Sequence, residues 1–223
     1  MNKLVLRPKG VVFDVGNVLI DWNPDYLFRK LIPCADERKW FLTHVCSMSW
    51  HAEQDRGRPC AAAACALAPR FPGYEGHIGA FYGRWLETIR GPIDGAVQVL
   101  ETLKEAGVPV FALSNFPAEL WDRTVAAYPF LGLFDDRVLS GEEGVGKPDR
   151  RIYDVLIERS GYGPEELVFI DDREENLATA HALGFRCMLF EDGGLLSTDL
   201  AEMGLPVFPT PVTGLTPLEG APA

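Results

Sequence analysis

The sequence predicts an α/β protein in which a doubly wound, Rossmann-like parallel sheet carries a small α-helical cap inserted after its first strand. From residue 91 onward, short apolar runs alternate with amphipathic helical patterns, and such alternation is typical of parallel strands joined by right-handed crossovers. Between the first apolar run and residue 91, only helical spacing is found. We therefore expect a core of residues 1–21 and 91–204, a cap of residues 22–90 and a Pro-rich tail of residues 205–223.

The first strand is predicted at residues 11–13, where a short apolar run stops at Asp14 and a turn containing Gly16 follows. In the segment from Pro24 to Arg90, apolar residues recur at spacings of three and four, and the stretch 69–73, rich in Pro and Gly, interrupts them once. This spacing predicts several amphipathic helices.

The second half of the chain gives the remaining elements in order. A helix is expected where Ala96, Leu100 and Leu103 share a face, and Gly107 is a stop signal for it. The pattern then predicts strands at 108–113, 137–139, 167–170 and 186–190, and helices at 119–127, around 152–156 and at 174–183.

Composition limits the classes of function. The hydrophobic fraction is 47% and the charged fraction 24%, as in ordinary globular proteins. A net charge of −11 without a basic stripe argues against binding to nucleic acid. No run approaches the roughly 18 apolar residues of a membrane span, and the apolar run within residues 1–10 is too short for a secretory signal. We expect a cytoplasmic protein whose five cysteines are reduced thiols.

Polar residues follow three of the predicted strands at the point where each strand ends. They are Asp14, the pair Ser114 and Asn115, and the pair Asp171 and Asp172. Ligands of doubly wound sheets bind beyond the carboxyl ends of the strands. Lys147 follows another strand and a glycine-rich loop at 141–146, so all four features are expected to converge on one rim.

Taken in order, these segments resemble the four motifs of the haloacid dehalogenase superfamily. They read FDVGNVL, LSN, GKPDRRIY and FIDD. Each alone has an ordinary structural interpretation, such as a turn or a helix N-cap, and the ordered set carries the resemblance. The helical segment lies where the IA-like subfamily places its C1 cap. The start D-x-G-N resembles a subgroup that includes sugar 1-phosphate phosphatases.

The resemblance implies a role for each residue. Asp14 is the nucleophile, and a carboxylate needs no base to act as one at neutral pH. Ser114, Asn115 and Lys147 bind the transferring group, and Ser114 and Lys147 also stabilise the reaction. Mg²⁺ suits a site with several carboxylates. Its ligands would be Asp14, the Gly16 carbonyl and Asp172, with Asp171 in support.

One position departs from the pattern of the phosphatases. They usually carry a second Asp two residues after the nucleophile, which protonates the leaving oxygen, and here Gly16 occupies that position. General acid catalysis contributes about 10²–10⁴-fold. The favoured interpretation is still a Mg²⁺-dependent phosphatase of a small phosphorylated metabolite, such as a sugar phosphate, acting through an aspartyl phosphate. The alternatives are a metal-independent 2-haloacid dehalogenase, whose halide leaving group needs no proton, and a module that binds a phosphorylated ligand without turnover.

The cap is expected to choose the substrate, because the core motifs contact only the reacting group. The polar stretch at residues 50–57 is the strongest candidate, with His51 or Arg56 contacting the leaving portion. Asp21, seven residues after the nucleophile, is a further candidate for a distant acid. We expect a monomer or homodimer acting on a small phosphorylated or halogenated molecule.

Overall fold

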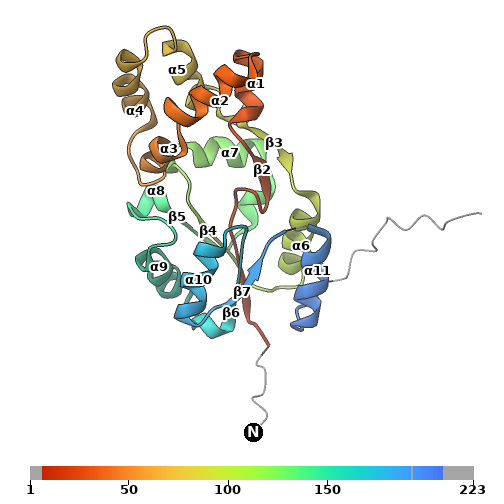
Figure 1. Cartoon of the computed structure of the whole chain (residues 1–223). Coiled ribbons are helices and arrows are strands. Elements are labelled where there is room, and N and C mark those ends of the chain that lie inside the picture. The colour runs from red at the N-terminus through yellow and green to blue at the C-terminus, as the bar shows by residue number, and fades with distance from the viewer. Residues whose placement is uncertain (1–6, 192, 208–223) are drawn as a thin grey trace, which may run out of the picture.

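The computed structural model describes residues 7–191 and 193–207. A five-stranded sheet lies at its centre (Figure 1). The strands are ordered β5-β4-β1-β6-β7, and every neighbouring pair is parallel. Their bounds are β1 Gly10–Phe13, β4 Val110–Ser114, β5 Asp136–Leu139, β6 Leu167–Asp171 and β7 Arg186–Leu189. The predicted parallel sheet is confirmed.

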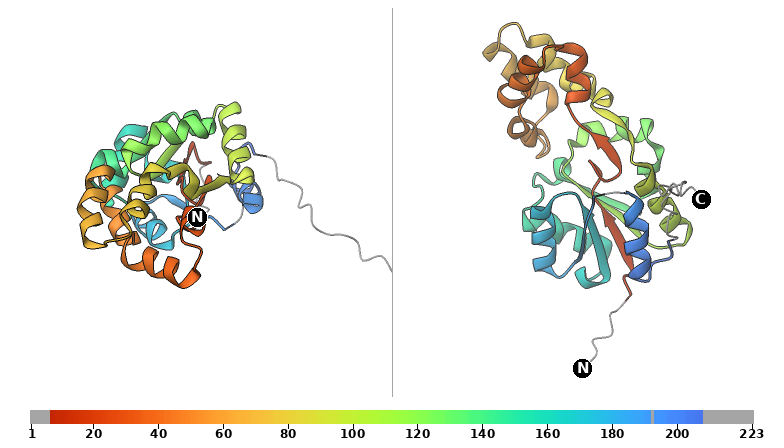
Figure 2. Two further views of the ribbon diagram at one scale, coloured as in Figure 1. Left: turned by 90° about the horizontal axis from the view of Figure 1, so that it is seen from above. Right: turned by 45° about the vertical axis from the view of Figure 1, so that its right-hand side comes forward.

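Helices cover both faces of this sheet, as the two views in Figure 2 show. One face packs against α6 (Asp94–Glu105) and α11 (Gly193–Glu202), and the other against α9 (Arg150–Ser160) and α10 (Glu174–Leu183). Side chains of β1 alternate between the two apolar clusters. Val11 and Phe13 join the first cluster, and Val12 joins the second. A strand buried on both faces needs a continuous apolar run, which explains the sequence of β1.

The helical insert, which we define as helices α1 to α5, lies between two short antiparallel strands. These strands are β2 (Ile20–Trp22) and β3 (Ile89–Pro92). The five helices gather beyond the carboxyl ends of the central strands (Figure 1). Their bounds are α1 Asp25–Leu31, α2 Ala35–His44, α3 Met48–Gln54, α4 Cys60–Leu67 and α5 Glu75–Gly83. The division into core and cap at residues 22 and 90 stays a prediction.

The insert has an aromatic interior of its own. The rings of Phe28 and Phe41 lie 4.8 Å apart, those of Phe28 and Phe81 lie 5.8 Å apart, and all three side chains are buried. These residues occupy the helical spacings from which the insert was predicted. Aromatic pairs at such distances add to the stability gained from apolar burial.

The structure corrects several predicted elements. The glycine-rich loop predicted at 141–146 begins instead with a helical turn, α8 (Ser140–Glu143), because the backbone of Phe116 accepts a hydrogen bond from Gly141 and donates one to the Ser140 hydroxyl. The strand predicted at 108–113 starts two residues later and ends one residue later, at Ser114, and the one predicted at 186–190 ends at Leu189. The sequence analysis missed β2, β3 and α11. It did predict the helix α7 (Trp121–Ala127), which follows a 3₁₀ turn at Ala118–Leu120.

The remaining short 3₁₀ helices are Ala68–Arg70, Trp85–Thr88, Pro129–Leu133 and Pro164–Glu166. Of the predicted Pro-rich tail, Leu205 and Val207 are buried against the core. Residues 208–223 lie outside the described part of the chain. None of the helices within residues 7–191 and 193–207 has the length and apolar character needed to cross a bilayer.

Candidate active site

Asp14 lies at the carboxyl end of β1, in the middle of the sheet, and its carboxylate is held on both oxygens. Oδ1 accepts hydrogen bonds from the Ser114 hydroxyl at 2.8 Å and from the Val15 amide at 2.7 Å. Oδ2 lies 3.0 Å from the Lys147 ammonium. Asp14 and Ser114 end neighbouring parallel strands, so the predicted convergence of strand ends brings these side chains together.

The turn after Asp14 depends on Asn17. This residue has a positive φ of 59°, a backbone conformation that Asn tolerates better than most residues with a side chain. Its backbone amide donates to the Ile20 carbonyl at 2.7 Å, and its side-chain oxygen accepts from the Trp22 amide at 3.1 Å. Asn17 thus folds the chain back so that Gly16 and Trp22 both line the space beside Asp14.

Lys147 is buried, with 1% of its side chain exposed, and bridges two carboxylates. Its ammonium lies 3.0 Å from Asp14 and 2.6 Å from Asp171. Asn115 fixes its backbone, accepting from the Lys147 amide at 2.7 Å and donating to its carbonyl at 2.9 Å. A Cβ at Gly146 would lie 2.6 Å from the Asn115 side-chain oxygen, so glycine is required there. Asn115 therefore positions Lys147.

Asp171 and Asp172 complete an acidic cluster with Asp14. Carboxylate oxygens of the three residues lie within 4.8 Å of one another. Both carboxylate oxygens of Asp171 are engaged in hydrogen bonds. They accept from Lys147, from the Arg173 backbone amide at 2.9 Å and from the Asn176 side-chain amide at 2.8 and 3.0 Å. Asp172 is half-buried and lines the pocket. Hard oxygen donors in this arrangement fit a divalent cation such as Mg²⁺.

The electrostatics of the cluster follow from burial and proximity. Burial raises the pKa of Asp14 to about 6, with Lys147 opposing the rise, so Asp14 is mostly ionised at neutral pH. Burial also raises the pKa of Asp172, and Asp171 adds to the effect. Burial acts against the charge of Lys147, but Asp14 and Asp171 outweigh it and hold the pKa of Lys147 above its ordinary value.

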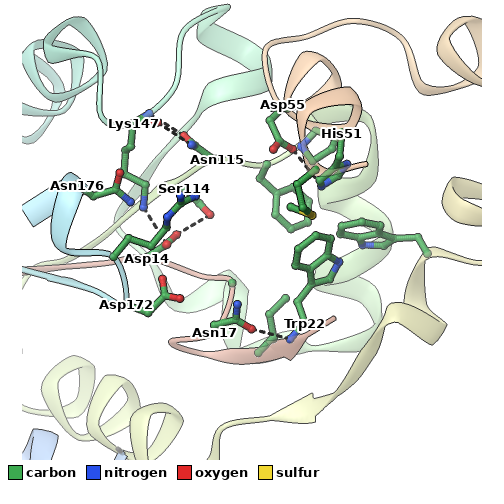
Figure 3. A pocket seen from close by; sticks show the side chains of 18 residues that line it. Asp14, Asn17, Trp22, His51, Asp55, Ser114, Asn115, Lys147, Asp172 and Asn176 are labelled. Atoms are coloured by element: carbon green, nitrogen blue, oxygen red, sulfur yellow. Dashed lines mark hydrogen bonds and ion pairs between the residues drawn. The ribbon is translucent and has the colours of Figure 1, made fainter. Parts of the chain in front are cut away.

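These groups open onto a cavity of about 330 Å³ between the sheet edge and the helical insert. Figure 3 shows Asp14, Ser114 and Lys147 on one side, with His51 and Asp55 of the insert facing them. The apolar part of the wall consists of Ile20, Trp22, Met48, Ala52, Trp85, Phe116 and Pro117, and Asn17, Arg173 and Asn176 add polar groups to the lining. The predicted residues Asp14, Gly16, Ser114, Asn115, Lys147 and Asp172 all line this cavity.

The residues predicted in the stretch 50–57 differ in position. His51 is buried and lines the cavity, whereas Arg56 is exposed and pairs with Glu53 at 3.2 Å outside it. Asp21 is also absent from the lining, since its carboxylate accepts from the Tyr26 hydroxyl at 2.7 Å and faces Arg90 at 3.3 Å.

Sequence reasoning missed several residues of the site, among them Trp22, Asp55 and Asn176. Asn176 could have been predicted from the sequence, because it falls in the first turns of the helix that follows the acidic pair Asp171 and Asp172. Asp55 lay inside the suspected polar stretch. Trp22 had no signal, because the strand that carries it was not predicted.

Comparison with known proteins places the chain in a family. The family model described as haloacid dehalogenase-like hydrolase matches residues 8–184, and the chain therefore belongs to this family of hydrolases. The sesquiterpene phosphatase astK of Aspergillus oryzae is 28% identical over 180 residues, which cover 79% of this chain and 86% of that protein. The (S)-2-haloacid dehalogenase 4A of Burkholderia cepacia is 32% identical over 90 residues, covering 40% of this chain and 39% of the relative.

A solved structure shares the fold. It is the family enzyme bt-2542 of Bacteroides thetaiotaomicron in complex with magnesium and inorganic phosphate, with a TM-score of 0.63 and 21% identity. The match covers 83% of this chain and 96% of the other. The motifs that suggested the superfamily thus lie in a chain that belongs to it, on the expected doubly wound sheet.

Proposed function

We propose that this hydrolase is a Mg²⁺-dependent phosphatase that removes phosphate from a small organic monoester through an aspartyl phosphate on Asp14. The observation that carries the proposal is the cluster of Asp14, Asp171 and Asp172 around the buried Lys147. Carboxylates gathered this closely repel one another unless a cation lies among them, which favours the metal-dependent phosphatase over the metal-independent dehalogenase. The phosphatase activity of the relative astK also supports the proposal.

The protein's own residues account for binding and attack. Ser114 and Lys147 already contact the Asp14 carboxylate, so a phosphate placed against Asp14 would meet a hydroxyl donor and a fixed positive charge. The Asp14 carboxylate attacks phosphorus, and the bond from phosphorus to the leaving oxygen breaks. Water then attacks phosphorus in the acyl phosphate and regenerates Asp14. Lys147 offsets the negative charge of both the nucleophile and the transferring group.

The carboxylate oxygens of Asp14 and Asp172 and the backbone carbonyl of Gly16 would hold the Mg²⁺ ion. Asp171 keeps its place through Lys147 and Asn176 and orients this cluster. When bound, Mg²⁺ acts as a Lewis acid that neutralises the phosphate and lets it approach a carboxylate. Asp171 thus supports the ligands from behind, as outer residues at metal sites commonly do.

The wall of the cavity favours a leaving portion with an apolar face. The rings of Trp22 and Trp85 lie 5.8 Å apart, and Trp22 stacks on His51 at 5.1 Å. Met48 and Phe116 extend this wall. An isoprenoid or aryl group would bury its surface there, with a gain of about 25 cal/mol per Å² of apolar area. The sugar phosphates expected from the D-x-G-N start stay in the set of candidates.

Two assays test the proposal. Phosphate release is measured from p-nitrophenyl phosphate, an isoprenyl monophosphate and a hexose 1-phosphate, with Mg²⁺ and with EDTA, and halide release is measured from 2-chloropropionate. The proposal expects phosphate release that EDTA abolishes, with the isoprenyl ester preferred over the hexose ester. Halide release that persists in EDTA, without phosphate release, would establish the dehalogenase alternative. Binding of phosphate without any turnover would establish the binding module.

A further inference from the structure

The proposed phosphatase lacks a proton donor at the position where the sequence pattern places one. Residue 16 is glycine and has no side chain to protonate a leaving oxygen. An alkoxide is a poor leaving group, so hydrolysis of an ester of an aliphatic alcohol needs an acid near the oxygen that departs. Asp21, the nearest acidic residue after Asp14 in sequence, is engaged by Tyr26 and Arg90 outside the cavity. Neither residue 16 nor Asp21 is therefore placed to supply the proton.

Asp55, at the end of α3, is the carboxyl group of the insert that lines the cavity. Figure 3 shows its side chain beside His51 on the insert side, with Asp14, Ser114 and Lys147 across the cavity. Its Oδ1 is buried and has no hydrogen-bond partner in the described part of the chain. A leaving oxygen that extends from a phosphate on Asp14 would enter the space between these groups.

Two contacts between the insert and the core hold Asp55 over the sheet edge. Gly57 has a φ of +92°, and a Cβ on it would lie 2.9 Å from the Gly141 carbonyl oxygen, so the two backbones touch closely. The Cys60 amide donates to the Glu119 carboxylate at 2.5 Å. Both contacts lie within five residues after Asp55, so the packing of this segment on the core holds Asp55 opposite Asp14.

The neighbours of Asp55 favour its protonated form. The Tyr82 hydroxyl donates to Gln54 at 2.8 Å, so His51 Nδ1, 2.8 Å from the same hydroxyl oxygen, acts as the donor to it. His51 Nε2 then presents a lone pair to Asp55 Oδ1 at 3.5 Å. Burial lowers the pKa of His51 to about 4, which keeps the ring neutral. Burial raises the pKa of Asp55 to about 7, with Arg56 opposing and Asp14 adding to the rise.

We propose that Asp55 is the general acid and base of the reaction and supplies from the helical insert the proton that residue 16 cannot supply. This inference rests on the proposed phosphatase function. As the bond between phosphorus and the leaving oxygen breaks, the proton of the Asp55 carboxyl moves to that oxygen and the alcohol departs. The Asp55 carboxylate then takes a proton from the water that attacks the acyl phosphate. The second step returns Asp55 to its protonated form.

The test varies the leaving group while the phosphate end stays the same. The values of kcat/KM for p-nitrophenyl, phenyl and benzyl phosphate are compared in the wild type, in Asp55→Asn and in Glu53→Gln, because kcat/KM reports the steps up to departure of the leaving group and not the hydrolysis of the aspartyl phosphate that the three esters share. The last variant removes an exposed carboxylate from the same helix and is the matched control. Asp55→Asn is expected to lose about 10²–10⁴-fold on benzyl phosphate, where the leaving alcohol needs a proton. It should lose much less on p-nitrophenyl phosphate, and Glu53→Gln should match the wild type on all three.

Each other outcome has a defined meaning. An equal loss of kcat/KM on all three esters in Asp55→Asn would overturn the inference and leave the phosphatase function standing. If the wild type releases phosphate from none of them, the proposed function fails and the inference fails with it. If the variant does not fold, the wild type alone still tests whether an acid protonates the leaving oxygen. Rates that fall steeply with the basicity of the leaving group would show that no acid operates, and similar rates on phenyl and benzyl phosphate would support Asp55.

Discussion

Replacing Lys147 by methionine tests the electrostatic account of the site through folding stability. The ammonium lies within 3.0 Å of both Asp14 and Asp171, and only 1% of the lysine side chain is exposed. Removing one partner of a buried ion pair costs about 3–5 kcal/mol, because the charge that remains is uncompensated. In a protein of this size, each kcal/mol shifts Tm by about 2–4 °C. We expect Lys147→Met to unfold about 10 °C lower than the wild type at neutral pH.

The sign of the pH dependence is a sharper test. Without Lys147, the pKa of Asp14 should rise beyond its value of about 6. The folded state then holds the proton of Asp14 more tightly than the unfolded state does. Stability is therefore lost as the pH rises from the pKa of Asp14 in the unfolded state toward its pKa in the folded state. Urea denaturation of both proteins should show a deficit in Lys147→Met that is larger at pH 8 than at pH 5.

The control is the double variant Lys147→Met/Asp171→Asn, which leaves one carboxylate fewer in the buried cluster. It should recover a substantial part of the lost stability at pH 8. The reasoning would be refuted if Lys147→Met lost less than about 1 kcal/mol of unfolding free energy at pH 8, because that is the value expected of an exposed ion pair. A deficit that stays constant between pH 5 and pH 8 would refute it as well.

Three further predictions concern the metal, residue 16 and Asp55. Asp172→Asn should raise the Mg²⁺ concentration needed for half-maximal turnover of p-nitrophenyl phosphate by at least about 10-fold, because the loss of even an outer residue that supports the ligands costs about 10- to 100-fold in metal affinity. An unchanged titration would exclude Asp172 as a ligand. A Cβ at Gly16 would meet no atom within 4 Å, so an aspartate fits at this position. The double variant Gly16→Asp/Asp55→Asn should therefore turn over benzyl phosphate at least about 10-fold faster than Asp55→Asn alone. No gain would argue that the lost activity is not that of a general acid. Because burial raises the pKa of Asp55 from 3.8 to about 7, its contribution to stability is full at low pH and is lost as pH rises through that window, by up to about 4 kcal/mol. In urea denaturation, the stability of Asp55→Asn relative to the wild type should therefore increase between pH 4 and pH 8. A stability difference between the two proteins that stays constant over this range would contradict the assigned burial. The other ionisable groups around Asp55 are Asp14, His51, Arg56, Cys60 and Tyr82.

Much of the core half of the site could be predicted because its residues follow directly after strands that short stretches of sequence identify. The strands β1, β4 and β6 are buried apolar runs that stop at polar residues, and parallel pairing brings their ends to one edge. Asp14, Ser114 and Asp172 follow from that rule alone. Lys147 was expected at the same edge because it follows a fourth strand.

The insert half of the site was less predictable. Helix α3 ends at Gln54 and Arg56 lies in the turn that follows, where it faces solvent although its neighbour Asp55 reaches the cavity. His51 and Asp55 are separated by four residues and share one face, but which face turns toward the core depends on packing that no local pattern records. The strands β2 and β3 were missed because each has only three or four residues and β3 contains Gly91 and Pro92.

The central claim is that Asp14 is a nucleophile toward phosphorus in a Mg²⁺-dependent reaction. Its most direct test is the hydrolysis of p-nitrophenyl phosphate by the wild type and by Asp14→Asn, each with Mg²⁺ and with EDTA. This ester needs little protonation of its leaving group, so glycine at position 16 does not mask the activity. The account predicts Mg²⁺-dependent turnover that falls at least about a thousand-fold in Asp14→Asn. Turnover that survives in Asp14→Asn, or that is the same in EDTA, would contradict it.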